Sequence, residues 1–108
     1  MTRSDPPAGV YRLKFLPEAL AEWNALDGSV KTVLRKLLKK RLVEPRVPGA
    51  KLHGSLQDCY KIKLRKQGYR LVYEVEDEVL TVLVLAVDKR ENLAVYRAAL
   101  DRLLASRS

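Results

Sequence analysis

The sequence predicts a small, single-domain α+β fold in which a four-stranded, mainly antiparallel sheet packs against an N-terminal helical hairpin and a C-terminal helix. Two observations support this fold class. One strand-like run and two helical stretches come first, and three strand-like runs then lead, through short turns, to a last helical stretch. Short turns between consecutive strands are typical of antiparallel neighbours. A chain of 108 residues fits one domain with one modest core.

The first part of the chain is expected to hold a tail, a strand and a helix. Residues 1–9 are rich in proline and glycine and predict a flexible tail, so the folded domain is expected over residues 10–105. Residues 10–16 alternate apolar and basic side chains, as a half-buried strand does. Pro17 suits the first position of a helix that we expect to run to Leu26, because the N–H that proline lacks has no partner there anyway.

The second helix has the clearest pattern. Ser29 is expected to cap it and Pro45 to stop it. Its apolar residues have the spacing of one buried stripe: Val30, Val33, Leu34, Leu37 and Leu38. The other face is basic and carries no acid: Lys31, Arg35, Lys36, Lys39, Lys40 and Arg41. Such a face is often merely solvated, and the alternatives are contact with RNA phosphates or with an acidic partner segment.

Three strands and a helix are expected after a glycine-containing loop. The strands are predicted over residues 59–65, 70–76 and 79–87, and the helix over residues 91–106. The third run is apolar throughout, which predicts a central strand covered on both faces. The helix is expected to turn one apolar side to the core: Val95, Ala99, Leu103 and Leu104.

Positive charge is concentrated on the first hairpin. We expect a loop over residues 66–69 that pairs Arg65 with Arg70 and Leu64 with Leu71, because this register keeps the apolar side chains on one face. The opposite face then gathers four cations: Lys61, Lys63, Arg65 and Arg70. Like charges placed so close together are destabilising. The face is therefore either simply solvated or built to bind an anion.

Composition excludes several classes of function. The net charge of +8 favours nucleic acid, an anionic membrane surface or an acidic protein as partner. A single cysteine, Cys59, allows no internal disulfide, and the longest apolar run, residues 79–87, is about half of what a membrane span needs. We therefore expect a cytoplasmic protein without a membrane partner.

The residues available for catalysis are lysine, arginine and tyrosine. The only histidine, His53, excludes a ribonuclease that uses a histidine pair as acid and base. The acidic residues 74–78 lack the spacing of ligands, so neither a metal nor another cofactor is predicted. Arginine binds phosphate with two hydrogen bonds, and a lysine among cations has a lowered pKa that suits a general base. Lys63 fits that description, and tyrosine can stack on an unpaired base.

Two runs, "DCYKIKLRKQGYRLVYEV" and "VDKRENLAVYRAAL", strongly resemble the RelE family of bacterial toxins, the ribosome-dependent mRNA interferases of type II toxin–antitoxin pairs. The resemblance covers roughly residues 10–104 and implies a RelE-like β-α-α-β-β-β-α order. It implies cleavage of messenger RNA in the ribosomal A site, by attack of a ribose 2′-hydroxyl on the scissile phosphate. It also implies a RelB-like antitoxin as partner, beside ribosomal RNA and mRNA.

The resemblance assigns a role to five residues by motif position. Lys63 would be the base and Lys61 would help to hold the phosphate, while Arg70 would stabilise the charge that builds on it. Arg90 would assist the leaving oxygen, and Tyr96 would stack on or orient a base. Further contacts to RNA or the ribosome are expected from basic residues of the hairpin and the second helix: Arg65, Lys66, Lys31, Arg35, Lys36, Lys39 and Lys40.

Three alternatives to an active interferase stay open. A ParE-like toxin would share the architecture but act on DNA gyrase without nuclease activity. A non-catalytic nucleic-acid-binding module would bind with a steep salt dependence and cleave nothing. An inactivated toxin is the third, because Asp88 stands where the family pattern has a small residue such as glycine, and its carboxylate could pair with Arg90.

Overall fold

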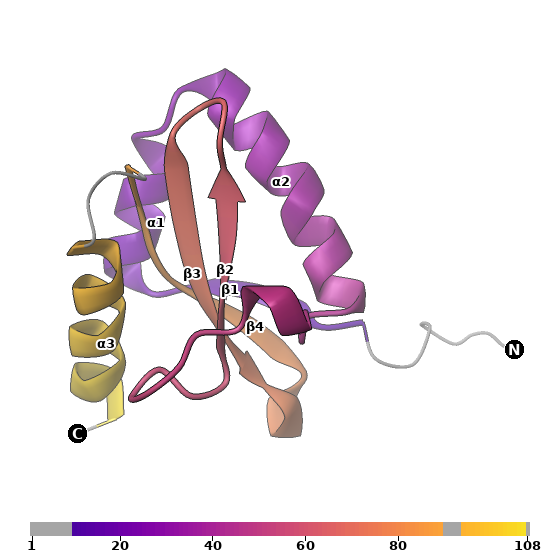
Figure 1. The fold of residues 1–108 in the computed structure, drawn as a ribbon, viewed down its shortest axis with the longest axis vertical. Coiled ribbons are helices and arrows are strands. Elements are labelled where there is room, and N and C mark those ends of the chain that lie inside the picture. The colour runs from indigo at the N-terminus through magenta and orange to yellow at the C-terminus, as the bar shows by residue number, and fades with distance from the viewer. Residues whose placement is uncertain (1–9, 90–93, 108) are drawn as a thin grey trace, which may run out of the picture.

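The computed structural model describes residues 10–89 and 94–107, and its architecture confirms the predicted α+β fold class and order of elements (Figure 1). The helices and strands are β1 (Arg12–Phe15), α1 (Pro17–Asn24), α2 (Gly28–Val43), β2 (Cys59–Leu64), β3 (Tyr69–Glu76), β4 (Thr81–Lys89) and α3 (Ala94–Arg107). Two short 3-10 turns, Pro48–Ala50 and Asp77–Val79, lie in the connections. The predicted tail, residues 1–9, lies outside the described residues.

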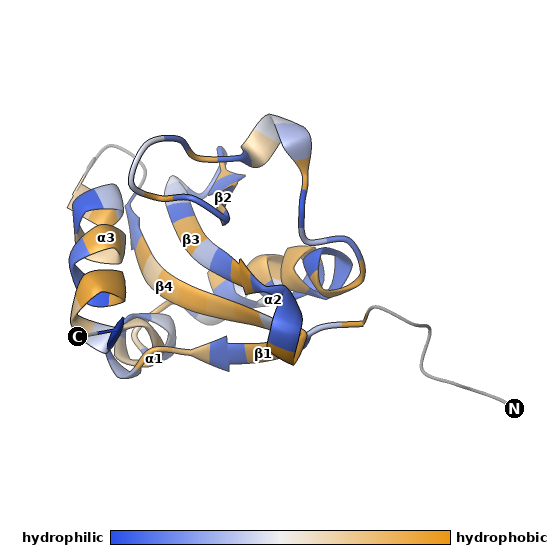
Figure 2. Ribbon diagram, turned by 90° about the horizontal axis from the view of Figure 1, so that it is seen from below, coloured by the Kyte–Doolittle hydropathy of each residue, from blue (hydrophilic) through white to orange (hydrophobic). Residues whose placement is uncertain are grey.

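The four strands of the described region form one sheet in the order β1-β4-β3-β2. β1 runs parallel to β4, whereas β2–β3 and β3–β4 are antiparallel. β4 therefore occupies the central place predicted for the apolar run, and Figure 2 shows it as a nearly continuous hydrophobic strand. It begins at Thr81 rather than at residue 79, because Asp77–Val79 forms a 3-10 turn and Leu80 follows with a positive φ of 47°.

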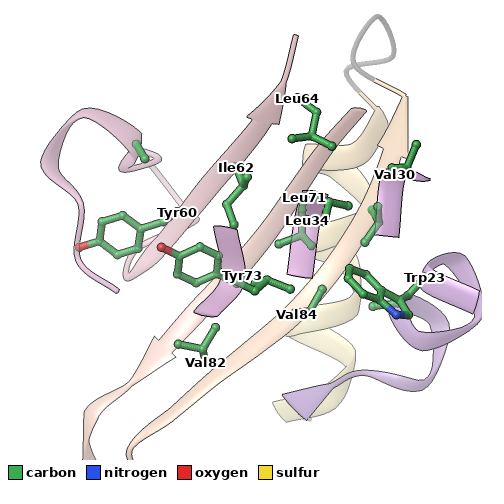
Figure 3. Packing of buried hydrophobic residues seen from close by; sticks show 14 of the residues in the cluster. Trp23, Val30, Leu34, Tyr60, Ile62, Leu64, Leu71, Tyr73, Val82 and Val84 are labelled. Atoms are coloured by element: carbon green, nitrogen blue, oxygen red, sulfur yellow. The ribbon is translucent and has the colours of Figure 1, made fainter. Parts of the chain in front are cut away.

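Helices cover both faces of the sheet (Figures 1 and 2). On one face, α1 and α2 bury Trp23 and Leu34 against the side chains of Ile62 and Leu71 (Figure 3). Leu38 belongs to the same cluster. On the other face, α3 packs through three buried residues in a smaller cluster: Val95, Ala99 and Leu103. The predicted stripe of α2 is confirmed, with Val30, Leu34 and Leu38 buried and Val33 and Leu37 packed beside them. Leu104, expected to face the core, is 61% exposed.

A buried polar network fixes the end of α2 against β2. The Tyr73 hydroxyl donates to the Pro45 carbonyl at 2.6 Å, and Nη1 of Arg41 donates to the Tyr73 hydroxyl at 2.8 Å. The same Arg41 nitrogen donates to the carbonyl of Lys61 at 3.2 Å. Arg41 is therefore turned inward rather than standing on the solvated basic face predicted for it. Because a buried polar group without a partner is costly, this network ties the backbone of β2 to α2.

The expected cap of α2, Ser29, is wrong by two positions. Gly28 is the first helical residue, and Asp27 occupies the N-cap position without a side-chain bond to the helix backbone. Ser29 lies inside the first turn, and its hydroxyl donates to Oδ2 of Asp27 at 2.8 Å. The sequence Asp27-Gly28-Ser29 offers two capping residues, and the pattern of apolar residues cannot choose between them.

The predicted register of the first hairpin is wrong by two residues. In the structure Lys63 pairs with Arg70 and Ile62 with Leu71, so the connecting residues are 65–68. Gly68 has a φ of +74°, and its N–H donates to the carbonyl of Leu64 at 2.8 Å. Glycine adopts this conformation at little cost, so the turn closes there and the next residue joins the strand. A shift of two residues leaves every side chain on its predicted face.

Candidate active site

The candidate site lies on the face of the β2–β3 hairpin that also carries α3. Along β2, Tyr60, Ile62 and Leu64 point into the core under α2, so Lys61 and Lys63 point to the opposite face. Lys61 is half-buried and Lys63 is exposed. Arg70 stands on this face directly opposite Lys63, in the corrected register. The strand alternation therefore gathers three of the predicted catalytic cations.

Tyr96 comes to the same place from α3. The guanidinium carbon of Arg70 lies 5.5 Å from the centroid of the Tyr96 ring, within the range of a cation–π contact. Tyr96 is half-buried and packs against the small cluster beneath α3. The structure thus brings Tyr96 of α3 to the hairpin residues Lys61, Lys63 and Arg70.

Arg70 carries an unusual buried donor. Its Nε is buried and has no hydrogen-bond partner among the described residues. A buried donor without a partner costs about 1–3 kcal/mol. An anionic oxygen bound beside Arg70 and the two lysines would supply the missing acceptor and offset this cost. Guanidinium groups bind phosphate in this way, with parallel hydrogen bonds.

The turn residues stand apart from the paired strands. Arg65 and Lys66 lie in the connection between β2 and β3 and are exposed. Arg65 was expected to pair with Arg70, and that expectation is wrong because the turn closes earlier. Both side chains extend the positive charge of the site toward solvent at the tip of the hairpin.

The basic surface of α2 is a separate region. Arg35, Lys36, Lys39 and Lys40 are exposed, whereas Lys31 is half-buried. α2 packs on the sheet face opposite to α3, so these side chains do not join Lys61 and Lys63. Arg35 also lies over the Trp23 ring, 6.0 Å from its centroid. The structure therefore gives the protein two positive surfaces on opposite sides of the sheet.

Asp88 is closer to the site than the sequence pattern indicated. It was expected to affect Arg90, which lies outside the described residues. In the β3–β4 ladder Asp88 stands directly opposite Arg70. Its Oδ1 also accepts a hydrogen bond from the N–H of Lys89 at 2.7 Å. The sequence could have indicated this neighbour only through the register of the second hairpin, in which β3 pairs with β4.

The acidic residues at the end of β3 and in the turn that follows make structural contacts, although the turn residues Asp77 and Glu78 are exposed. Glu74 is only 3% exposed, and both its oxygens accept from Nη2 of Arg107 at 2.6 Å. Burial raises the pKa of the Glu74 carboxyl, and Arg107 partly offsets this effect. Asp77 accepts from Arg46 at 2.7 Å and from the Tyr11 hydroxyl at 2.6 Å. Within residues 10–89 and 94–107, no three metal-ligating side chains are grouped to hold an ion.

Two further features lie outside the candidate site. A pocket of about 700 Å³ opens at the C-terminal end of α3, between Arg46, Glu74 and Arg107. Cys59 is fully buried, and burial, followed by the charge of Glu74, raises the pKa of its thiol to about 12. The thiolate is therefore not available as a nucleophile at neutral pH.

The arrangement suits phosphate chemistry at an exposed strand. Lysine and arginine side chains on rigid antiparallel strands can hold an anionic group and stabilise added charge on it. A tyrosine ring beside them can stack on an unpaired base. Across the described part of the chain, no helix has the length and apolar character required to cross a membrane.

Known toxins of type II toxin–antitoxin systems match this chain in sequence. The sequence model of the family described as "ParE toxin of type II toxin-antitoxin system, parDE" matches residues 13–94. A putative RelE-like toxin protein of Escherichia coli is 50% identical over 93 residues, which cover 86% of this chain and 97% of that protein. The mRNA interferase toxin RelE of Escherichia coli is 49% identical over 94 residues, covering 87% and 98% of the two chains.

Solved structures agree with the sequence relatives. Free Escherichia coli toxin RelE, in a variant with two arginines changed to alanine, superposes with a TM-score of 0.81 at 47% identity and covers 87% of this chain and 98% of that one. The toxin in the intact Escherichia coli RelBE toxin–antitoxin complex gives a TM-score of 0.72 at 49% identity, with coverage of 76% and 99%.

Proposed function

This chain belongs to the RelE/ParE family of toxins of type II toxin–antitoxin systems, and on that premise we propose that it is an mRNA interferase that cleaves messenger RNA in the ribosomal A site. The family membership confirms the resemblance drawn from the two sequence motifs. The identity of about one residue in two extends over nearly the whole of the relative named mRNA interferase RelE. The chain is thus an endoribonuclease that inhibits translation.

The observation that carries the proposal is the grouping of Lys61, Lys63 and Arg70 beside the ring of Tyr96. In the proposed reaction Lys63 takes the proton of a ribose 2′-hydroxyl, whose oxygen attacks the adjacent phosphorus. The bond from phosphorus to the 5′-oxygen of the next nucleotide breaks and leaves a 2′,3′-cyclic phosphate. Lys61 holds the phosphate and Arg70 stabilises its added negative charge, since such electrostatic stabilisation often lowers the barrier more than any other effect.

The other two roles complete the scheme. Tyr96 stacks on a base next to the cut and fixes the orientation of the strand. Arg90, outside the described residues, assists the leaving oxygen as a charge partner. We assign it no proton transfer, because the pKa of arginine lies above about 12. None of these residues forms a strong acid–base pair, so we expect the chain to cut free RNA poorly and to depend on the ribosome for orientation of the mRNA.

The second positive surface suits contact with the ribosome. The exposed lysines and arginine of α2 form a row of charges that can pair with the phosphates of ribosomal RNA. The turn residues Arg65 and Lys66 extend the catalytic face toward the same kind of partner. We place the action of the protein in the cytoplasm, where ribosomes and mRNA meet.

A RelB-like antitoxin is the protein partner. Relatives of this chain are seen with such partners in the intact Escherichia coli RelBE complex and in a complex of Escherichia coli RelE with an antitoxin RelB peptide. The net charge of +8 fits an acidic antitoxin segment, since opposite charges steer association. Such a segment would compete with RNA for the positive surfaces.

The proposal is tested with purified protein and ribosomes stalled with an empty A site. Primer extension is expected to locate a cut within the A-site codon, and the cut should vanish without ribosomes. An mRNA with a 2′-deoxy nucleotide immediately before the cut should resist cleavage, because it lacks the attacking hydroxyl. Cleavage of the deoxy substrate would contradict the proposed mechanism.

The family model named after ParE favours one second candidate, a toxin that acts on DNA gyrase. The filled lysine, arginine and tyrosine positions argue for the interferase. If no cut appears on the ribosome, the same preparation should be added to a gyrase supercoiling assay. Inhibition there, with no RNA cleavage, would replace the interferase by the gyrase-directed toxin.

A further inference from the structure

The central strand β4 contains a bulge just before it reaches the candidate site. Val84 pairs with Tyr73 and Ala86 pairs with Val72, so Leu85 is an extra residue without a partner in the ladder. A bulge leaves polar backbone groups unpaired and redirects the residues that follow it. Those residues include Asp88, which stands opposite Arg70. The bulge therefore sets the register of β4 with Arg70.

Among residues 10–89 and 94–107, no strand pairs with the edge of β4 beyond the end of β1. β1 pairs with β4 only as far as Val84. The N–H of Val87 instead donates to Oε1 of Glu22 at 3.0 Å. The carbonyl of the bulge residue Leu85 accepts from Nη1 of Arg102 at 3.0 Å. Side chains of α1 and α3 thus satisfy backbone groups that a longer edge strand and a regular ladder would have satisfied.

Glu22 and Arg102 also bind each other. Nη1 of Arg102 donates to Oε1 of Glu22 at 2.8 Å, and Nη2 donates to Oε2 at 2.9 Å. The two side chains are 31% and 19% exposed, so the pair is largely shielded from solvent. Burial acts to raise the pKa of the Glu22 carboxyl, but the hydrogen bonds from Arg102 and Val87 outweigh it and the pKa is lowered. We call Glu22, Arg102 and their bonds to Leu85 and Val87 the β4 clasp.

The β4 clasp holds the helix that carries Tyr96. Arg102 lies on α3 about 1.7 turns after Tyr96, at a rise of about 1.5 Å per residue. A bidentate bond to Glu22 and a bond to a buried carbonyl restrain Arg102 along and around the helix axis. The helix cannot slide over the sheet without breaking them. The separation between the Tyr96 ring and Arg70 therefore depends on the same pair that holds the bulge.

We propose that Glu22 and Arg102 are positioning residues for RNA cleavage, which hold the end of β4 and α3 so that Arg70 and Tyr96 act on one nucleotide. Neither residue is among the candidate catalytic residues, and both act through the backbone of β4 and through α3. The inference rests on the proposed function. A displacement of about 1 Å at a catalytic group can cost about a hundredfold in rate, so loosening the β4 clasp affects the chemical step more than binding.

The test compares two ion pairs that involve α3, one that joins it to Glu22 of α1 and one within the helix. Glu22→Gln removes the negative charge of Glu22 but keeps a side-chain oxygen that can accept from the N–H of Val87. Arg102→Met removes the bonds of Arg102 to Glu22 and to the Leu85 carbonyl. Asp101→Asn is the matched control for Glu22→Gln, because Asp101 forms an exposed pair with Arg97 at 3.9 Å on α3. Single-turnover cleavage on programmed ribosomes and affinity for those ribosomes are measured for each variant.

Arg102→Met is expected to slow single-turnover cleavage about tenfold or more, with ribosome affinity changed less than about twofold. Glu22→Gln should slow it less, and Asp101→Asn not at all. Glu22→Gln makes the protein more positive, so a purely electrostatic effect would strengthen its binding to the ribosome. Such an effect cannot explain a slower cleavage step. If rate and affinity fall together, or if neither clasp variant differs from Asp101→Asn, the positioning role is wrong.

A second readout does not depend on cleavage. The protein is labelled with 3-fluorotyrosine, and the Tyr96 resonance is identified by its loss in Tyr96→Phe. The resonance should move in Arg102→Met and Glu22→Gln and stay in place in Asp101→Asn. If the parent protein cuts no RNA, the proposed function fails, and the fluorine shift alone decides whether the β4 clasp places Tyr96. An unmoved resonance in both clasp variants would overturn the inference. Should Arg102→Met not fold, Glu22→Gln carries both readouts.

Discussion

Arg70 of β3 lies over the ring of Tyr96 of α3, with 5.5 Å between the guanidinium carbon and the ring centroid. In this contact Arg70 meets the face of the Tyr96 ring and not its hydroxyl. We therefore expect the ring, rather than the hydroxyl, to matter for cleavage. We predict that Tyr96→Phe keeps most of the cleavage rate, while Tyr96→Ala lowers it about tenfold or more, since stacking contributes about 1–3 kcal/mol per base. Single-turnover cleavage checks this. A Phe variant as slow as the Ala variant would show instead that the hydroxyl takes part in the chemistry.

The turn of the first hairpin depends on one glycine. Gly68 has a φ of +74°, which disfavours any side chain, whereas Gly28 begins α2 with open space around its Cα. Gly68→Ala is expected to lower the free energy of unfolding by about 1–2 kcal/mol. Gly28→Ala should raise it by about 0.4–1 kcal/mol, because alanine restricts the unfolded chain. Urea unfolding of both variants measures the difference, and equal effects at the two positions would contradict it.

Cys59 should resist thiol reagents in the folded protein. Burial raises its pKa to about 12, so at about pH 8 almost none of it is thiolate. We expect no reaction with a disulfide reagent under native conditions and a stoichiometric reaction in denaturant. Rapid labelling of the native protein, with its circular dichroism unchanged, would mean that the face under α3 opens readily.

Glu22 and Glu74 should have opposite effects on the pH dependence of stability. The folded pKa of Glu22 is lowered, so its ionised form adds stability above the unfolded value near 4.5 that is lost as the pH falls through the folded pKa. The folded pKa of Glu74 is raised mainly by burial, so its protonated form adds stability below the unfolded pKa. This stability is lost as the pH rises through the folded pKa.

Two carboxamide variants separate these effects. From about pH 7 to about pH 3, the stability advantage of the parent over Glu22→Gln should shrink, while the stability of the parent relative to Glu74→Gln should grow. Chemical denaturation at several pH values gives both differences. Parallel changes for the two variants would be inconsistent with the opposite environments of the two carboxyl groups.

The sequence pattern predicted the order of elements and the face of each hairpin side chain, because local periodicity determines both. The position of the turn was wrong, because a shift of two residues leaves the alternation of Ile62 and Lys63 unchanged. In the sequence Arg41 looks like one more surface cation, but in the structure it turns inward and donates to the Tyr73 hydroxyl and the Lys61 carbonyl. The contact of Glu22 with Arg102 joins residues 80 positions apart and depends on a bulge that leaves no signal in the pattern.

The cationic face of the hairpin is tested most directly by one substitution on the ribosome. Lys63→Met should lower the single-turnover rate of A-site cleavage at least about a hundredfold, the lower range for loss of a general base. Lys14→Met, which removes an exposed lysine of the same charge from β1, should cleave like the parent. A Lys63→Met protein that binds ribosomes and still cuts at the parental rate would contradict the assignment of this face as the active site.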